Sequence, residues 1–280
     1  MLKDRTWILA TKYIVLITLC IVMMLPVLVA FLGSIRSTGD FVTRPFALPS
    51  SIDRIQWQNY TDILTDSGFW QKALNSLIIA SSVTVINVVF ASMLAFVFSR
   101  IQFRTRTLWF NILSIGLLFP LVVAILPIFI QVRSFGLTGK LLGVILPMAA
   151  FGLPGSVVIL RGFFIAIPQE LEEAAYIDGA SIYHFFLFIL IPIARPALFA
   201  IATISIIAAW NDFFLALVVL GSNPDAWPLT LGLMQFQGQY GTDWAPIMAY
   251  ITILMIPAIV FYLFAEKYIV TGLTGGELKG

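Results

Sequence analysis

The sequence predicts an all-α integral membrane protein with six transmembrane helices, and two observations carry this prediction. Hydrophobic residues make up 60% of the 280 residues and charged residues only 11%, whereas a soluble domain carries about 25% charged residues. The mean hydropathy of +0.99 reflects apolar residues that are gathered into long runs. A helix needs about 20 residues to cross the hydrocarbon core, so each long run is a candidate membrane span.

Six apolar runs are long enough to span a bilayer. They do not alternate apolar and polar residues as the strands of a membrane barrel do, so we expect helices to be the spanning elements. No soluble domain or low-complexity linker interrupts them, which predicts a single transmembrane domain over residues 1–280. The runs lie near residues 14–34, 75–98, 107–131, 141–162, 193–220 and 245–265.

The distribution of Lys and Arg predicts the orientation, because these residues are enriched in cytoplasmic loops. An even number of spans places both termini on one side. With the N-terminus inside, ten of the sixteen Lys and Arg residues face inward, and the outer 221–244 loop has none. The first run could be a cleaved signal peptide, but its apolar stretch exceeds the roughly 7–15 residues of such a segment. We therefore expect a multi-pass protein of the cell membrane with both termini on the cytoplasmic side.

A compact acidic block lies in the inner segment between the fourth and fifth runs, at residues 163–192. Four of the fourteen acidic residues fall between Glu170 and Ser181. Pro168 is placed as a first-turn residue of a short helix, and Gly179 can adopt the left-handed conformation that ends it. Ser181 can cap a second helix, an apolar one that we expect to stop before the next proline.

Two interpretations of this block are open. It could be an amphipathic connector lying on lipid headgroups, but such helices usually carry Lys and Arg on their polar face, and anionic lipids would repel Glu and Asp. Alternatively, Leu171, Ala174 and Ala175 share one helix face by their spacing and would let another backbone approach closely. The acidic residues beside them favour a protein partner with a basic-rimmed groove.

The same residues resemble a known motif. Glu173-Ala174-Ala175, followed by Gly179 and then by Ile189-Leu190-Ile191-Pro192, resembles the EAA loop of ATP-binding-cassette importer permeases. The longer stretch Ile167–Ser181 looks like the carbohydrate-importer version of that loop. The family's usual leucine before the proline is an isoleucine here. Further similar segments are Trp57–Tyr60, Asn75-Ser76, Ala95–Arg100, Trp210–Phe213 and the maltose-permease-like tail Lys267–Gly280.

The resemblance implies the membrane-spanning permease subunit of an ATP-driven sugar or oligosaccharide importer, of the shorter, second-subunit kind. A second homologous permease would complete the pathway, two ATPase subunits would bind ATP and Mg, and an extracytoplasmic binding protein would deliver the sugar. The chain itself would hold no cofactor, and the membrane would be a bacterial or archaeal cytoplasmic membrane. The resemblance assigns coupling to the ATPase to Glu170, Glu172, Glu173, Ala174, Ala175, Asp178, Gly179, Ala180 and Ser181.

The sequence predicts no catalytic site on this chain. The nearest match to a phosphate-binding loop, Gly136–Leu141, is too short and lacks the final hydroxyl residue. With one His and one Cys, a transition-metal cluster is not expected, and a net charge of +2 implies no nucleic-acid partner. We expect the chain to be surrounded by membrane lipid. Energy for active transport would have to come from a partner or an ion gradient.

Two rival functions therefore stay open from the residues alone. An ion-coupled transporter normally needs ionisable residues at membrane depth, and Asp212 is the one candidate well within a predicted span. Trp210, which could stack on a sugar ring, and Asn211 are placed with it as a candidate substrate path. The other rival is a membrane assembly protein without transport activity, which only the acidic block argues against.

Overall fold

The structure, a computed structural model, describes residues 2–48, 55–238 and 241–273. The described chain is helical apart from one short antiparallel pair, β1 (Gln237–Gly238) and β2 (Gly241–Thr242), in which Gln237 is opposite Thr242. Residues 274–280, the last part of the tail that resembles a maltose permease, lie outside the described residues.

The chain forms two compact units, which are described separately. The first contains the residues up to Trp70 together with Gly232–Pro257, and the second contains Gln71–Leu231 and the residues from Ala258 onward. In the first unit the helices are α1 (Leu2–Ser34), α2 (Thr38–Thr43), α3 (Gln58–Thr65), η5 (Leu233–Phe236) and the part of α14 (Trp244–Leu273) up to Pro257.

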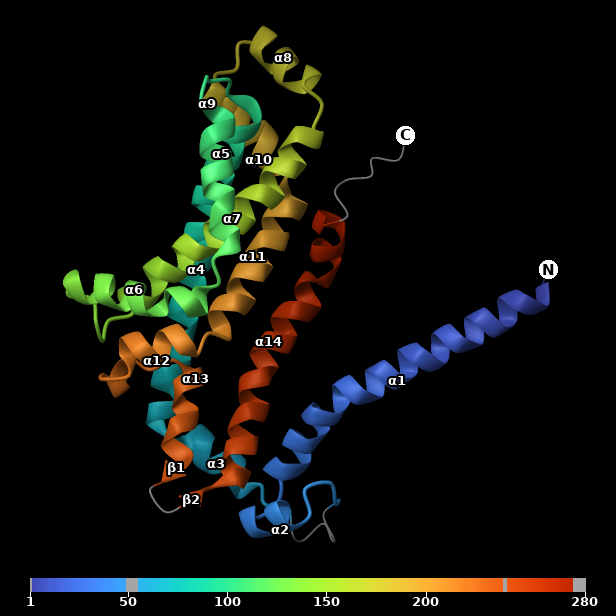
Figure 1. Cartoon of the computed structure of the whole chain (residues 1–280), viewed down its shortest axis with the longest axis vertical. Helices are drawn as coiled ribbons and strands as arrows, with labels where there is room; N and C mark the ends of the chain where they lie inside the picture. Colours follow the sequence, from blue (N-terminus) through green and yellow to red (C-terminus); the bar gives the residue numbers. More distant parts are fainter. Residues whose placement is uncertain (1, 49–54, 239–240, 274–280) are drawn as a thin grey trace. The chain divides into compact units, whose positions relative to one another are not determined.

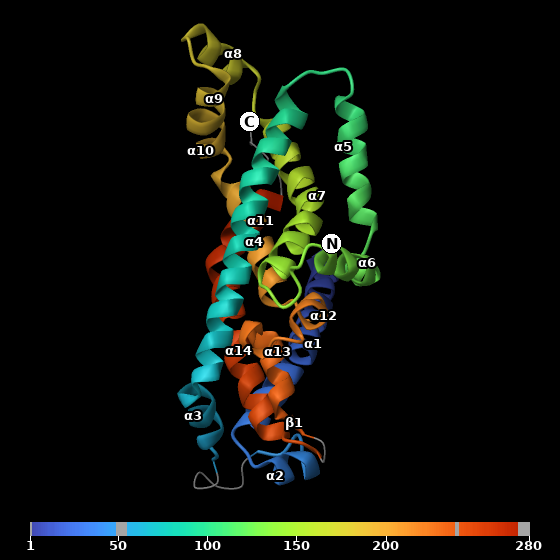
Figure 2. The ribbon, with the colours of Figure 1, turned by 90° about the vertical axis from the view of Figure 1, so that its left-hand side faces the viewer.

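The second unit holds the helical core. Figures 1 and 2 show α4, α7 and α11 running alongside one another, with α8 beyond their ends. Its elements are α4 (Ser67–Arg100), α5 (Arg106–Ile115), η2 (Gly116–Leu118), α6 (Leu121–Ser134), α7 (Leu142–Ala166), α8 (Glu170–Ile177), α9 (Ile182–His184), η3 (Phe185–Leu190), α10 (Ile191–Ile193), α11 (Arg195–Trp210), α12 (Phe214–Leu220), η4 (Pro224–Ala226) and α13 (Leu229–Gly232).

Four described helices are long and apolar enough to cross a membrane, and the number rises to six if two bent helix pairs each make one span. The four are Trp7–Ser34, Ser67–Arg100, Leu142–Ala166 and Trp244–Leu263. They contain the first, second, fourth and sixth predicted runs almost entirely. The all-helical membrane architecture predicted from the sequence is thereby confirmed, and the two bent pairs are where the expected boundaries differ.

The third predicted run, 107–131, is not one straight helix. Helical segments Arg106–Leu118 and Leu121–Ser134 meet at 104°. The break falls at Pro120, which has no N–H to continue the helix and which pushes Phe119 into an extended conformation, with φ −96° and ψ 110°. A proline restricts the residue before it in this way, so the bend follows from Phe119-Pro120.

The fifth predicted run, 193–220, differs at both ends. The second bent pair joins Ile182–Ile193 to Arg195–Trp210, so its helical chain begins before residue 193, and the predicted run is also divided after Trp210. Helix α11 ends at Trp210, and α12 begins only at Phe214. In the break, the Asp212 carboxylate accepts a hydrogen bond from the backbone N–H of Ala216 at 3.0 Å. An Asp side chain that binds a nearby backbone N–H favours a new helix start over continuation of the old one, which explains the division.

The core of the second unit is a cluster of small and aromatic side chains. Ala91 and Ala95 of α4 share this buried cluster with Leu160 and Phe164 of α7, and Ala197 adds α11 to it. Small residues that allow close helix approach are typical of membrane interfaces. This cluster extends to Ala175, Phe185 and Leu190, so it also holds the segment that follows α7.

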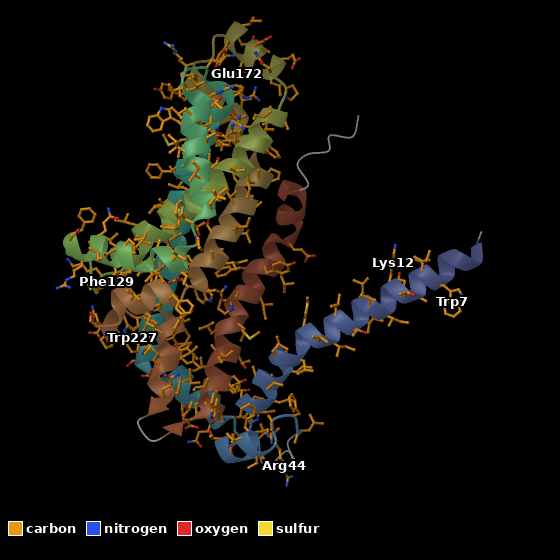
Figure 3. The ribbon with its side chains drawn as sticks, in the orientation of Figure 1. Trp7, Lys12, Arg44, Phe129, Glu172 and Trp227 are labelled. Atoms are coloured by element: carbon orange, nitrogen blue, oxygen red, sulfur yellow. The ribbon has the colours of Figure 1, made fainter. Side chains whose placement is uncertain are left out.

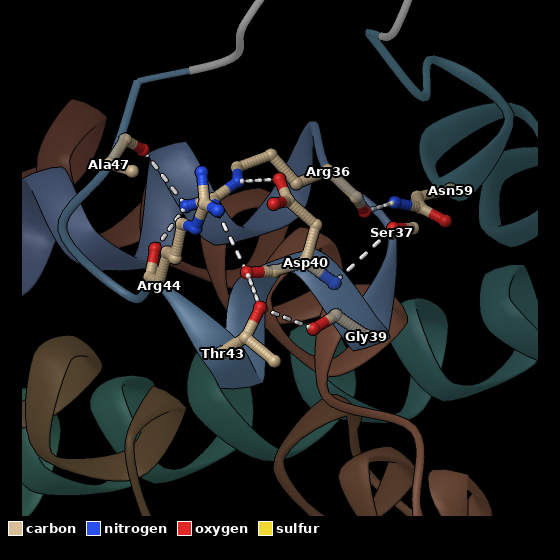
Figure 4. A network of polar contacts seen from close by, with 8 residues as sticks. All are labelled: Arg36, Ser37, Gly39, Asp40, Thr43, Arg44, Ala47 and Asn59. Atoms are coloured by element: carbon tan, nitrogen blue, oxygen red, sulfur yellow. Dashed lines mark hydrogen bonds and ion pairs between the residues drawn. The ribbon is translucent and has the colours of Figure 1, made fainter.

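The first unit is organised around one buried arginine, Arg36, whose side chain is 2% exposed (Figure 4). Its Nε donates to the Asp40 carboxylate at 2.7 Å. Nη1 donates to the carbonyl oxygens of Arg44 and Ala47 at 2.7 and 2.9 Å, and Nη2 donates to the Asp40 carbonyl at 2.9 Å. Five N–H donors in a fixed fork suit this task, and they fold the segment around α2 onto the end of α1.

Candidate functional site

The acidic block forms a short helix that begins two residues later than expected. Helix α8 starts at Glu170, and the Gln169 carbonyl accepts hydrogen bonds from the N–H groups of Glu172 and Glu173 at 2.9 and 3.1 Å. Pro168 therefore precedes the helix instead of standing in its first turn. The reason is that Ile167 before it is extended, with φ −75° and ψ 129°, as the residue before a proline prefers.

The glycine turn after α8 confirms the sequence prediction. Gly179 has φ +82°, in the left-handed region. The Ala180 N–H donates to the Ala175 carbonyl at 2.9 Å, and the Gly179 N–H donates to the Tyr176 carbonyl at 3.1 Å, which together form a Schellman motif. The Ser181 hydroxyl then accepts a hydrogen bond from the His184 N–H at 3.2 Å, so this residue caps the next helix as predicted.

The second helix of the block does not stop before Pro192, contrary to expectation. After α9 the chain widens into a π-helical stretch, η3, in which the Ile191 N–H donates to the Phe186 carbonyl five residues earlier. Pro192 follows in the first turn of α10, where a missing N–H is tolerated. The helical chain then bends by 76° into α11, so the proline marks a bend and not an end.

The predicted coupling residues do not all face outward. Glu170, Glu173, Ala174, Asp178, Gly179 and Ser181 are exposed, whereas Glu172 and Ala180 are half-buried. Ala175 is only 6% exposed and belongs to the apolar core. Its small side chain thus anchors α8 to the helices behind it, and the exposed face of α8 is formed by its neighbours.

One exposed apolar residue of this block was not predicted from the sequence. Ile177, the last residue of α8, is 86% exposed, and Leu171 on the same helix is also exposed. A large aliphatic side chain directly before the Asp178-Gly179 turn was the available signal, since a residue at that place has no following helical turn to cover it. Exposed apolar side chains rimmed by acidic ones are typical of a protein contact surface.

Glu172 is held inside the chain. Its Oε2 accepts a hydrogen bond from Nη1 of Arg100 at 3.3 Å, and its Oε1 accepts one from the Tyr176 hydroxyl at 2.9 Å. Figure 3 places Glu172 on the segment that joins α7 to the glycine turn. Partial burial, and then the hydrogen bond to Glu172, raise the pKa of Tyr176, so the phenol stays protonated and able to donate.

Two arginines join the ends of α4 and α7 next to this ion pair. Arg100, the last residue of α4, donates from Nη2 to the carbonyl oxygens of Phe164 and Ile167, each at 2.6 Å. In the opposite direction, Nε of Arg161 on α7 donates to the Phe98 carbonyl of α4 at 3.0 Å. These carbonyls lie near helix C-termini, where they lack partners within the helix, so each arginine satisfies the end of the other helix.

The second candidate site, Trp210–Asp212, is occupied by internal contacts. Trp210 is buried, with its ring edge-on to Phe261 at 5.8 Å between centroids. Asn211 donates to the Ile207 carbonyl at 2.9 Å, and the Asp212 carbonyl accepts the Thr230 hydroxyl at 2.7 Å. The structure therefore brings the three residues together at a helix break, and Trp210 does not present its ring to solvent.

A cavity of about 250 Å³ lies between α4, α7 and α11. It is mostly apolar, but Asn87, Ser156 and Ser205 are among the residues that line it. Asn87 is 1% exposed, and its Oδ1 is buried without a hydrogen-bond partner in the part of the chain that the structure describes. These three residues were not predicted from the sequence, in which Asn87 is one polar residue in a long apolar run.

No group of three or more His, Cys, Asp or Glu side chains that could hold a metal ion occurs among residues 2–48, 55–238 and 241–273. The chemistry that the candidate site offers is recognition: acidic and apolar side chains on a capped helix–turn–helix. A helical membrane protein that carries such a block beside the ends of two spans is in the class of membrane transport subunits.

The chain belongs to the family described as "Binding-protein-dependent transport system inner membrane component", which matches residues 87–274. It is 32% identical over 272 residues to the diacetylchitobiose uptake system permease protein NgcG of Streptomyces coelicolor, covering 96% of this chain and 89% of that protein. It is 37% identical over 227 residues to the trehalose/maltose transport system permease protein MalG of Thermococcus litoralis, covering 80% of this chain and 81% of that protein.

A solved structure agrees with these relatives. The chain matches one from a bacterial ABC transporter involved in the import of the acidic polysaccharide alginate, with a TM-score of 0.80 and 26% identity over 95% of this chain and 97% of that chain. The resemblance drawn from the EAA-like loop is therefore confirmed: this is a membrane permease subunit of an ABC importer. Both rival functions, ion-coupled transport and membrane assembly, are disfavoured.

Proposed function

We propose that this chain forms half of the translocation pathway of an ATP-driven importer for sugars or oligosaccharides and couples to its ATPase through residues 163–192. The observation that carries the proposal is the Schellman-capped helix α8, which exposes acidic and apolar side chains together. The names of the relatives, a diacetylchitobiose and a trehalose/maltose permease, support an uncharged oligosaccharide as cargo.

The exposed face of α8 suggests how an ATPase subunit would bind. Ile177 and Leu171 would enter an apolar groove, since they are the large exposed aliphatic side chains of this helix. Glu170, Glu173 and Asp178 would face basic residues at the rim of that groove, where charge complementarity orients a partner more than it adds affinity. Ala174 and Gly179 would allow close approach, and Ala180 and Ser181 would complete the edge of the turn.

The remaining partners follow from the same proposal. A second homologous permease would complete the pathway, an extracytoplasmic binding protein would deliver the sugar, and two ATPase subunits would supply ATP and Mg. This chain would carry out no catalysis and hold no cofactor. We place both termini and residues 163–192 on the cytoplasmic side of a cytoplasmic membrane, because the excess of Lys and Arg lies on that side.

For the substrate path we propose the cavity of the second unit together with the break at Trp210, Asn211 and Asp212. The buried, unpaired Oδ1 of Asn87 is suited to accept a hydroxyl hydrogen bond, since an unmade hydrogen bond at a buried polar atom costs about 1–3 kcal/mol. Release of the Trp210 ring from Phe261 would expose an aromatic face on the same path. The companion permease would contribute the opposite wall.

The test is ATP hydrolysis and sugar uptake by the purified complex in proteoliposomes. We expect the sugar-loaded binding protein to stimulate hydrolysis, and uptake to stop when the ATPase carries a substitution that blocks hydrolysis. Uptake should persist when ion gradients are collapsed with ionophores. Gradient-dependent uptake that continues with an inactive ATPase would show instead that the ion-coupled alternative is correct.

A further inference from the structure

Arg100 lies outside the loop, at the end of α4, but its side chain contacts three residues between Phe164 and Glu172. Its guanidinium donates to the Phe164 carbonyl, the Ile167 carbonyl and the Glu172 carboxylate. Its side chain is 8% exposed and that of Glu172 is 14% exposed. One side chain therefore joins the end of α4, the end of α7 and the first turn of α8.

The contacts to α7 are those expected at a helix end. The last carbonyls of α7 have no partners within the helix, and a cation is favoured there by the helix dipole. The planar fork of an arginine can reach two carbonyls and a carboxylate at once, which the single ammonium of a lysine cannot do in the same geometry. Both terminal nitrogens of Arg100 thus meet acceptors, whereas its Nε is buried without a hydrogen-bond partner in the part of the chain that the structure describes.

Arg161 makes the joint reciprocal. Its Nε donates to the Phe98 carbonyl on α4, and its guanidinium lies 4.1 Å from the ring centroid of Phe110 on α5. Each of α4 and α7 therefore contributes an arginine that binds the last turn of the other. Two such contacts in opposite directions resist sliding between the helix ends better than one.

Glu172 is the member of this group that belongs to α8. Both of its carboxylate oxygens are used within the chain, by Arg100 and by Tyr176, so it is less available to a partner than the exposed Glu173. Two kinds of contact hold α8 to the helices behind it. Ala175 packs into the apolar core, and the Arg100–Glu172 ion pair connects α8 to α4 through polar groups.

We propose that Arg100 and Glu172 are positioning residues that transmit displacement of α8 to the ends of α4 and α7 together. This inference rests on the proposed function, because it assumes that an ATPase moves α8. It changes the role of Glu172 from a contact with the ATPase to a connection inside the permease. With the connection intact, α8 and the two helix ends move as one body; without it, α8 moves while the two spans lag behind.

The test compares variants in the complete complex reconstituted with its binding protein and ATPase. For Glu172→Ala we expect the ATP hydrolysed per sugar imported to rise about threefold or more, as coupling residues commonly change such linkage by factors of this order. The ATPase should co-purify in unchanged amount. Glu172→Gln, which keeps an acceptor for Arg100, should recover part of the loss, and a residue needed only for folding would not change this ratio.

The matched pair at the other end is Arg100→Lys and Arg104→Lys, since Arg104 lies four residues further along and is exposed. Arg100→Lys should raise the ratio and Arg104→Lys should leave it unchanged. A wild-type ratio in both Glu172→Ala and Arg100→Lys would overturn the inference, and so would loss of the ATPase from the Glu172→Ala complex. Failure of the proposed function would appear differently, as uptake independent of ATP in the wild-type complex.

Discussion

Gly179 shows how one backbone angle determines the shape of the loop. A Cβ built at this position would meet no atom within 4 Å, so a side chain here is not excluded by space. The constraint is the φ of +82°, which costs a non-glycine residue about 1–2 kcal/mol. A substitution therefore acts on the turn itself and on the angle between α8 and α9.

We predict that Gly179→Ala lowers sugar uptake severalfold and raises the ATP hydrolysed per sugar, because the strained turn shifts α8 relative to the helices behind it. Gly179→Asn should be milder, since Asn tolerates the left-handed region better. The control is Gly162→Ala in α7, where an added Cβ also meets nothing within 4 Å and φ is not positive. Equal uptake in Gly179→Ala and Gly162→Ala would refute the role of the turn.

Glu173 is the exposed acid of the loop that is best placed to meet a partner. Its carboxylate is engaged only locally in the described structure, accepting from Nε2 of Gln169 at 3.2 Å. We predict that Glu173→Lys weakens association with the ATPase, since a like charge opposite a basic rim is repelled, and that the loss grows at low salt. Co-purification at several salt concentrations measures it.

The control for this charge reversal is Asp62→Lys, an exposed acid on α3 in the segment that we place outside the membrane. It should leave ATPase association unchanged at every salt concentration. An unchanged yield of ATPase with Glu173→Lys would count against Glu173 as a docking residue and would move the contact to the apolar side chains of α8.

At the level of elements, α2 depends on a side chain outside itself. Arg36 gives hydrogen bonds to three backbone carbonyls and one carboxylate, and hydrogen bonds to charged groups contribute about 1.5–3 kcal/mol each. We predict that Arg36→Met exposes residues 37–47 to exchange, lowering the local free energy of opening by about 2–4 kcal/mol. Hydrogen exchange measured by mass spectrometry gives this value.

Arg44→Met is the matched control, because the Arg44 side chain is exposed (Figure 3) and only its backbone groups take part in the network, the carbonyl accepting from Arg36 and the N–H donating to the Asp40 carbonyl. Its exchange should stay close to that of the wild type. Protection of α8 should be the same in both variants, since the hydrogen bonds described for the Arg36 side chain go to Asp40, Arg44 and Ala47. Unchanged exchange of residues 37–47 in Arg36→Met would show that α2 is held by packing alone.

The elements that sequence analysis predicted well are those fixed by local chemistry. Apolar runs gave the long helices, and Gly179 and Ser181 gave the turn and the cap. The differences arise where proline or a polar side chain acts across several residues. Pro120 bends the third run, Asp212 divides the fifth, and a π-helical stretch carries the chain past Pro192. A straight helix and a bent or divided one have the same spacing of apolar residues, so this spacing could not predict the breaks.

The candidate site was only partly predictable for a related reason. The acidic residues of the loop are visible in the sequence, but which of them faces outward depends on distant partners. Glu172 turns inward because Arg100, 72 positions earlier, lies within reach, and Ala175 is covered by the core. Asn87 could not be singled out, since the cavity beside it is formed by three helices from separate parts of the chain.

For the whole molecule, the orientation in the membrane decides whether the loop can meet an ATPase at all. Helix α1 is exposed along most of its length, as expected of a helix that contacts lipid and not a protein core. Its orientation therefore has to follow from charge, since Lys and Arg favour the cytoplasmic side. The orientation that we propose has Ile177 inside and Gln58 of α3 outside.

We predict that single cysteines will be labelled from opposite sides by a maleimide that does not cross membranes. Cys20, the free cysteine of the described chain, is first replaced by Ser. Gln58→Cys should react in intact cells, and Ile177→Cys only in inside-out vesicles, where added ATPase should slow its labelling because it covers that side chain. Arg104→Cys, exposed on the same side, should react equally with and without ATPase. Reaction of Ile177→Cys in intact cells would place the loop outside and exclude coupling to a cytoplasmic ATPase.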